Sequence, residues 1–165
     1  MSDATQTSQT DRQLRIVKKA IAKGSFCTLA TASAANRPHV AGVVYAEADG
    51  DLYVSIMESS VKARNIAANP RVAVTIPVRR LPIGPPFTIQ FQGTAEIVPS
   101  NDPRIAALIE RGKLKTVTSH GEVELPGGCF VKITPARRVA THGLGVPLLS
   151  VIRNPLAAGR TVELY

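Results

Sequence analysis

The stretch Ser59-Ser60-Val61-Lys62-Ala63-Arg64-Asn65-Ile66-Ala67-Ala68-Asn69-Pro70 decides how this chain is interpreted. Ser59 or Ser60 is a favourable residue to begin a helix, because a Ser side chain can accept a hydrogen bond from an amide of the first turn. Asn69-Pro70 is a favourable end, because the residue before a proline avoids helical geometry. The sequence therefore predicts a short helix with Lys62 in its first turn.

A lysine in the first turn of a helix is unusual in its electrostatics. The helix dipole and the unpaired amides already make the potential there positive, so Lys62 costs a few tenths of a kcal/mol unless an anion lies beside it. The Ser hydroxyls, the amides, Lys62 and Arg64 together form a candidate phosphate-binding site. The alternative is a solvated lysine on a surface turn.

Length and composition indicate one globular domain. The chain has 165 residues, of which 44% are hydrophobic, and this is enough to bury a core. The polar residues 1–10 are expected to be disordered, and 11–165 to form a single domain with a C-terminal extension from about residue 144. There is no secretory leader pattern and no apolar run of about 18 residues, so we expect a cytoplasmic protein without a membrane span.

The net charge and the histidine and cysteine residues limit the range of possible functions. The net charge of +8 is spread along the chain and aromatic residues make up 4%, so nucleic acid is not expected as a partner, whereas a multiply charged small anion is. His39, His120 and His142 lack metal-ligand spacing, so no metal site is expected. Cys27 and Cys129 lie in apolar runs and are expected to be reduced and buried; a disulfide or a nucleophile is the alternative. No residue can be named as catalytic, so a bound cofactor is expected to supply the reactivity.

The hydrophobic pattern predicts a mainly β fold, a six-stranded antiparallel β-barrel with α additions. The strand at 39–47 is apolar on both faces, so we expect it to be covered on one side by the barrel interior and on the other by another element or subunit. The segment 79–86 is a basic, Pro-rich loop. The predicted strands are 26–33, 39–47, 52–57, 71–78, 87–98 and 128–133. The predicted helices are 11–23, the short helix that ends before Asn69, 103–113 and 146–153.

The order of several short motifs carries a resemblance to a known family. In chain order these are Leu29-Ala30-Thr31-Ala32, Arg37-Pro38-His39-Val40, Leu52-Tyr53-Val54-Ser55, Lys62-Ala63-Arg64-Asn65-Ile66, Asn69-Pro70-Arg71-Val72-Ala73-Val74, Gly93-Thr94-Ala95 and residues 133–139. Over about residues 11–143 they closely resemble the pyridoxamine 5′-phosphate oxidase-like superfamily. The resemblance implies an FMN-binding split β-barrel, and a homodimer with two flavin sites at the subunit interface, each built from both chains.

The resemblance also implies roles for individual residues. Lys62 takes the position of the phosphate-binding lysine, Ser60 that of the serine in the phosphate turn, and Thr88 that of the glutamine that contacts the flavin ring. Tyr45 could supply a proton or hydrogen bond near the ring, or could simply be an aromatic residue of the barrel wall. The implied cofactor-binding residues are Val40, Gly42, Val44, Tyr45, Ser55, Ile56, Ser60, Lys62, Arg64, Arg79, Arg80 and Thr88.

The chain departs from the oxidase proper in ways that point to a different activity. Val61 stands where the oxidase has an arginine, and the chain has no tryptophan, so oxidation of vitamin B6 is not the leading expectation. The motifs around Lys62 and Arg37 look more like the actinobacterial flavin/deazaflavin oxidoreductases, many of which use the deazaflavin coenzyme F-420. The polyanionic tail of that coenzyme would suit Arg79 and Arg80.

We therefore expect an oxidoreductase that transfers a hydride between a reduced deazaflavin (F-420) or FMN and a small organic acceptor such as an enone or quinone. Alternatives are a non-catalytic carrier of a flavin or deazaflavin, a pyridoxamine phosphate oxidase, and a heme-binding relative on the same fold.

Overall fold

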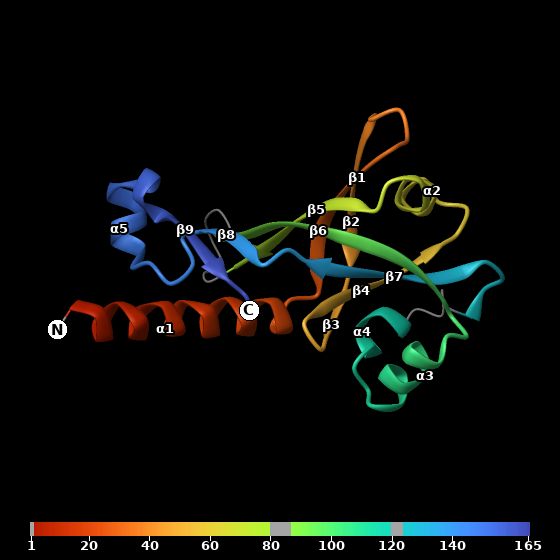
Figure 1. Ribbon diagram of the computed structural model, residues 1–165, viewed down its shortest axis with the longest axis horizontal. Coiled ribbons are helices and arrows are strands. Elements are labelled where there is room, and N and C mark those ends of the chain that lie inside the picture. The colour runs from red at the N-terminus through yellow and green to blue at the C-terminus, as the bar shows by residue number, and fades with distance from the viewer. Residues whose placement is uncertain (1, 80–86, 120–123) are drawn as a thin grey trace.

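The computed structural model describes residues 2–79, 87–119 and 124–165, with side chains from residue 9 onward. A single curled antiparallel sheet dominates it (Figure 1). The order of the strands across the sheet is β2-β1-β5-β6-β7-β4-β3, with β8 added to β6 and β9 added to β8. The strands are β1 Phe26–Ala32, β2 Pro38–Val44, β3 Ala46–Ala48, β4 Asp51–Met57, β5 Arg71–Val78, β6 Phe87–Pro99, β7 Gly128–Pro135, β8 Arg138–His142 and β9 Gly159–Glu163.

The mainly β, antiparallel prediction is confirmed, but the count of six strands is wrong, since the described residues form nine. One reason is that the predicted strand 39–47 divides at Tyr45. There the backbone amide donates to the Ser25 carbonyl at 2.9 Å and the phenol donates to the Ile21 carbonyl at 2.7 Å, so the chain turns between β2 and β3. The other reason is that β8 and β9 lie in segments whose sequence predicts no strand.

The sheet curls until strands from its two ends approach each other. β2 lies at one end of the strand order and β4 near the other, yet the two are in contact. Among the described strands no hydrogen-bonded ladder joins them, so the barrel is open along a seam between β2 and β4. Val40 and Val44 of β2 are exposed in the single chain, so no described element of the chain covers this face of residues 39–47, and its cover by another subunit stays a prediction.

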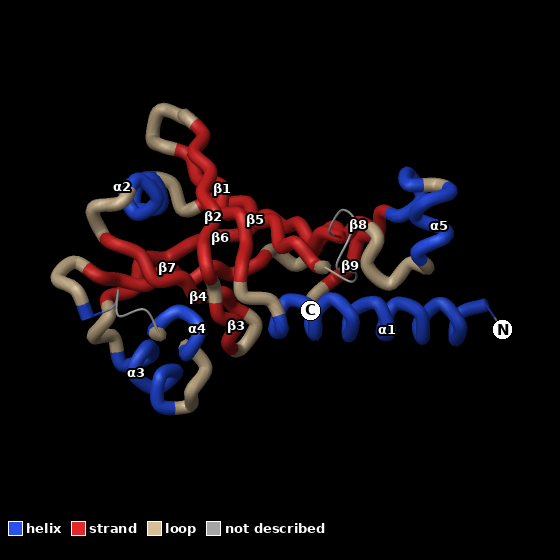
Figure 2. Tube along the Cα trace, turned by 180° about the vertical axis from the view of Figure 1, so that it is seen from behind, coloured by secondary structure: helices blue, strands red, loops and turns tan. Residues whose placement is uncertain are grey.

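Helices flank both ends of the sheet (Figure 2). Helix α2, Val61–Ala68, and the pair α3, Pro103–Glu110, and α4, Lys115–Thr118, lie at one end. Helix α1, Ser2–Lys23, and helix α5, Leu148–Arg153, which leads into a 3-10 turn at Pro155–Ala158 (η2), lie at the other. The predicted helix 103–113 ends early because the chain reverses at Gly112, whose φ is +70°.

Helix α1 begins at Ser2, well before the predicted start at Asp11. Residues 2–13 contain no glycine or proline, so nothing in the backbone stops the helix from continuing toward the N-terminus. Within the described part of the chain, no helix combines the length and the apolar character needed to span a bilayer.

Among the described residues, the interior consists of two apolar clusters. The larger one fills the curled sheet, and the smaller one, around Ile105, Leu114 and Phe130, lies between α3, α4 and the sheet. Cys27 and Cys129 are buried and free, as expected. Burial raises the pKa of the Cys27 thiol to about 12, so this side chain is a neutral, unreactive part of the core.

Candidate functional site

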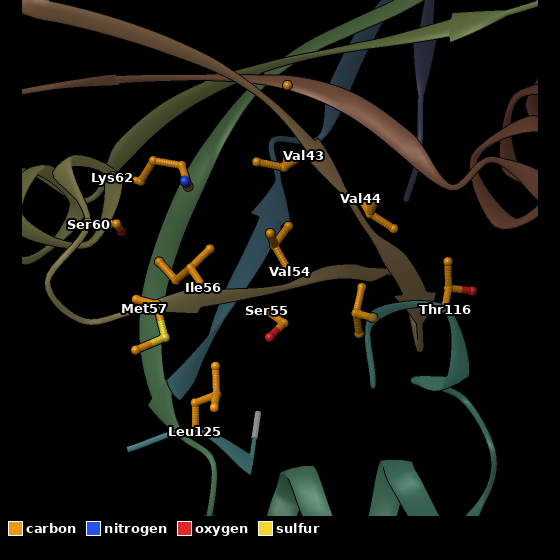
Figure 3. A pocket seen from close by; sticks show the side chains of 12 residues that line it. Val43, Val44, Val54, Ser55, Ile56, Met57, Ser60, Lys62, Thr116 and Leu125 are labelled. Carbon is orange, nitrogen blue, oxygen red and sulfur yellow. The ribbon is translucent and has the colours of Figure 1, made fainter. Parts of the chain in front are cut away.

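A pocket of about 500 Å³ lies on the seam between β2 and β4 (Figure 3). It is bordered by the two strands, by the start of α2 and by α4. Six of the residues implied by the family resemblance line it: Gly42, Val44, Ser55, Ile56, Ser60 and Lys62. Residues far apart in the sequence thus meet in one cavity, because the sheet curls and brings β2 next to β4.

The start of α2 is built as the sequence predicts. Ser60 is the N-cap residue, with φ −70° and ψ 154°, and its hydroxyl accepts a hydrogen bond from the Ala63 amide at 3.2 Å. Lys62 follows in the first turn, half-buried, and its side chain reaches from α2 into the pocket (Figure 3). The dipole of α2 and the ammonium group of Lys62 therefore make this end of the pocket positive.

Helix α2 is fixed to the sheet by a buried polar contact. The Asn65 amide nitrogen donates to the Thr31 hydroxyl of β1 at 3.0 Å, and both side chains are buried. Ala63 and Ile66 of the same helix are also buried. The position of Lys62 relative to the seam is therefore set by the packing of α2 on β1.

Ser55 of β4 shows that the pocket has an unmet polar requirement. Its hydroxyl is buried, and no hydrogen-bond partner for it exists among the described residues. Buried hydroxyls in native proteins normally have a partner, and leaving one without costs about 1–3 kcal/mol. Since Ser55 lines the pocket, a polar group of a bound ligand can supply that partner.

The rest of the pocket is mainly apolar. Val44 of β2, Val54 and Ile56 of β4, and Leu125 provide hydrocarbon surface, while Lys62 and the hydroxyls are confined to a few positions. Such a lining favours a ligand with a flat apolar part and an anionic group at one end. Lys62 is the one titratable side chain among the described residues that line the cavity.

The other six residues that line the pocket are not in the set implied by the family resemblance. Val43 and Val54 are ordinary strand residues, Met57 ends β4, and Thr116, Val117 and Leu125 come from the α4 region. Only the packing of α4 against β4 and β3 brings that region to the seam. No signal in the sequence would have found it.

Tyr45, implied as a cofactor contact, lies outside the pocket. It is fully buried in the core and its hydroxyl donates to the Ile21 carbonyl at 2.7 Å. Burial raises the pKa of this phenol, so it stays protonated and engaged with α1.

The remaining predicted residues also lie away from this cavity. Val40 is exposed on β2, Arg79 is exposed after β5, and Thr88 lies on β6 opposite Pro77 and His142. The guanidinium of Arg64 donates to the Ser59 carbonyl in the turn before α2. Arg80 lies outside the described residues. No group of three or more potential metal ligands occurs in the described part of the chain.

The curled antiparallel sheet, open along one seam that carries a pocket, defines a split β-barrel. Residues 16–141 match the sequence profile of the family described as pyridoxamine 5′-phosphate oxidase, and the chain belongs to that family. The resemblance seen in the order of the motifs is thereby confirmed. No curated protein matches the chain in sequence.

Solved structures with the same fold differ in what their names say they bind. HutZ, the heme storage protein from Vibrio cholerae, is 18% identical with a TM-score of 0.65 over 78% of this chain and 94% of HutZ. An FAD-binding protein from Mesorhizobium loti is 24% identical with a TM-score of 0.57 over 75% and 89% of the two chains. An F-420 reductase is 22% identical with a TM-score of 0.52 over 72% and 92%. At these identities the similarity shows the fold alone.

Proposed function

We propose that the seam pocket binds a phosphate-bearing flavin or deazaflavin, FMN or coenzyme F-420, and that the protein is an oxidoreductase. In this proposal a hydride passes between the reduced cofactor and a small organic acceptor such as an enone or quinone. The observation that carries it is the meeting, in one mainly apolar pocket, of Lys62 at the start of α2 and the unpartnered hydroxyl of Ser55.

The residues present fit such a cofactor. Lys62 and the amides at the start of α2 would hold the phosphate, and Ser55 would donate to or accept from the polar chain that links phosphate and ring. Gly42 and Val44 would form the wall beside the ring, with the side chains of Val54 and Ile56 excluding water. When bound, a reduced flavin or deazaflavin supplies the hydride; the protein positions the ring and keeps the site dry.

The same proposal includes a homodimer. Val40, Arg79 and Thr88 do not line the pocket of their own chain. In a dimer whose sites are built from both chains, as the family resemblance implies, such residues would contribute to the site of the partner. The FAD-binding protein and the F-420 reductase of the same fold support a flavin-type ligand. A cytoplasmic location stays a prediction.

The deciding experiment is a binding titration of the purified protein with FMN and with coenzyme F-420. Replacing Lys62 by Ala should weaken binding about 5- to 150-fold, the range that corresponds to losing a charged hydrogen-bond partner. Lys18→Ala removes the same charge from the exposed face of α1 and should leave the affinity unchanged. Unchanged binding by Lys62→Ala would remove this residue from the site.

The spectrum and the kinetics separate the alternatives. A protein that binds neither cofactor, or shows a Soret band with heme instead, contradicts the proposal. Stopped-flow oxidation of the bound reduced cofactor by quinones and enones tests turnover. Tight binding without accelerated oxidation would identify a carrier rather than an enzyme.

A further inference from the structure

A second cavity, of about 370 Å³, lies between helix α1 and strand β9. Its volume is in the range of small-molecule sites. Figures 1 and 2 place β9 next to α1, and the two elements are in contact. None of its lining residues belongs to the seam pocket. This α1–β9 cavity is lined by Gln9, Thr10, Arg12, Gln13, Ile16, Gly145, Val146, Pro147, Arg160, Thr161 and Val162.

The charge at the α1–β9 cavity is positive. Arg12 and Arg160 both border it, and none of the described lining residues is acidic. Asp11 precedes Arg12 in the sequence but does not line the cavity, and Glu163, on the same strand as Arg160, is engaged in ion pairs elsewhere. Two cations beside one cavity repel each other, so an anion placed there would be stabilised by both.

Both guanidinium groups have N–H donors to offer a ligand. The Arg160 Nη1 donates to the carbonyls of Ala157 and Gly159, at 2.7 Å each, and these bonds hold the side chain in place without neutralising it. The side chain of Arg12 makes no hydrogen bond or ion pair with the described part of the chain. A guanidinium has five N–H donors and binds carboxylate and phosphate groups in a bidentate manner.

One wall of the cavity is fixed by a close approach between Gln13 and Gly145. The Gln13 carboxamide donates to the Leu144 carbonyl at 2.8 Å, which ties α1 to the segment before α5. Gly145 has φ +77°, and a Cβ at this position would collide with the Gln13 side chain. Only glycine combines that backbone conformation with the space available. The cavity is therefore a built feature of the fold rather than a gap between loose surface side chains.

Thr141 gives the strand pair beside the cavity an unmet polar requirement. It lies directly opposite Arg160 in the register of β8 and β9, so the two side chains share one face, and Val162 of the same face lines the cavity. Thr141 is 3% exposed, and its hydroxyl has no hydrogen-bond partner among the described residues. Buried hydroxyls are normally paired, and an occupant of the cavity can supply the partner directly or through a water molecule.

We infer that the α1–β9 cavity is a second ligand site, which binds a small organic anion carrying a phosphate or carboxylate group. The anionic group would lie at Arg12 and Arg160. The carbon skeleton would lie on the apolar part of the lining, Ile16, Val146 and Val162. Because such a ligand contacts α1 and β9 at once, it would stabilise the docking of one on the other. The inference does not depend on the cofactor of the seam pocket.

Thermal unfolding with inorganic phosphate and with citrate tests the site. The full chain carries Lys62→Ala throughout, so that anions at the seam pocket do not contribute. Each anion is compared with sodium chloride of equal ionic strength, and at least one of them should raise the melting temperature above the chloride value. The more effective anion identifies phosphate or carboxylate as the preferred group.

Two arginines of α1 give the matched comparison. Arg12→Gln should weaken the apparent affinity for the anion about 10- to 100-fold, because charge-assisted hydrogen bonds are lost. The fold should be retained, since the side chain has no partner in the described chain. Arg15→Gln removes the same charge from an exposed position outside the cavity and should leave the affinity unchanged. No stabilisation beyond that in chloride, or equal weakening by both variants, overturns the inference.

Chemical modification of arginines tests where the anion binds. Phenylglyoxal reacts with exposed arginines, and mass spectrometry of the digested protein gives the rate at each one. The anion that stabilises the protein should slow the reaction at Arg12 and Arg160 and leave Arg15 unchanged. Unchanged rates at Arg12 and Arg160 overturn the inference. The titrations with FMN and coenzyme F-420 are separate and should be unaffected by Arg12→Gln, so the proposed function can fail while this site stands, and the reverse.

Discussion

The barrel and the C-terminal arm, residues 138–165, are built from the same kinds of residue but are stabilised differently. In the barrel, strands such as β4 and β7 bury Leu52, Val54 and Ile133 almost completely. In the arm, Val139 and Val162 of the two strands are buried, but α5 and most of η2 remain exposed. Regular hydrogen bonding is present in both regions. In the barrel it is accompanied throughout by burial of apolar surface within the chain, whereas in the arm this burial is confined to the strands and the residues next to them and does not extend to α5.

The largest expected difference in stability comes from replacing an isoleucine by alanine in each of the two regions. Ile133→Ala removes a fully buried side chain of β7 and should lower the free energy of unfolding by about 2–5 kcal/mol. Ile152→Ala, in the exposed face of α5, should change it by less than about 0.5 kcal/mol in the isolated chain. Urea denaturation at low protein concentration measures both values.

Repeating both measurements over a range of protein concentrations makes this comparison more specific. If the proposed homodimer covers α5, the loss of stability caused by Ile152→Ala grows as the protein concentration rises into the range where dimers form, because the folded dimer is stabilised by mass action. The cost of Ile133→Ala should hold at every concentration. Equal losses for the two variants at low concentration would show that the arm is as well buried as the barrel.

Replacing one asparagine in each region should give a difference in stability of intermediate size. Asn65→Ala removes the donor to the buried Thr31 hydroxyl and should cost about 1–3 kcal/mol. Asn154→Ala removes an exposed cap of η2, where the side chain accepts from the Ala157 amide at 3.3 Å, and should cost about 0.5 kcal/mol. Thermal and urea unfolding measure both. Because Asn65 fixes α2, its loss should also weaken cofactor binding, which Asn154→Ala should leave intact.

The smallest effect is expected at the surface ion pairs that tie the end of β9 to the start of β8. Glu163 accepts from Arg138 at 3.2 Å and from Arg137 at 2.9 Å. The hydrogen bond from Arg138, followed by the charge of Arg137, holds the pKa of Glu163 below its ordinary value. The pair therefore stabilises the fold fully above the unfolded Glu pKa of about 4.3, and this contribution is lost as the pH falls through the lower folded value.

Glu163→Gln should remove this part of the acid dependence and have little effect at neutral pH in high salt, since exposed ion pairs are screened. Stability measured from neutral pH to below pH 4 in low and high salt checks it. A salt-independent loss at neutral pH would mean that the arm depends on this contact more than its exposure indicates.

The sequence predicts the part of the site that depends on residues close together in the chain, which is helix α2 with Lys62 in its first turn. Helix α2 is correct because Ser60 and Asn69-Pro70 act within the segment they bound. The position of Lys62 in its first turn follows from the same residues, and the family resemblance placed a phosphate group beside it.

Features decided by distant contacts were not predictable. The division of residues 39–47 into β2 and β3 depends on hydrogen bonds from Tyr45 to Ser25 and Ile21, which the strand pattern does not reveal. β8 and β9 form because each finds a neighbouring strand, and their sequences alone carry little β pattern. Thr116 and Leu125 reach the pocket only through the packing of the α4 region.

The engagement of the Tyr45 phenol with the last turn of α1 has a consequence for the source of protons. With that hydroxyl committed, and with an ammonium as the one ionisable group among the described pocket residues, a single chain offers no carboxylic acid, imidazole or phenol to protonate a reduced product. Bulk solvent would have to deliver the proton. If the proposed hydride transfer takes place there, it should favour acceptors whose reduction leaves a delocalised, long-lived anion, as quinones do.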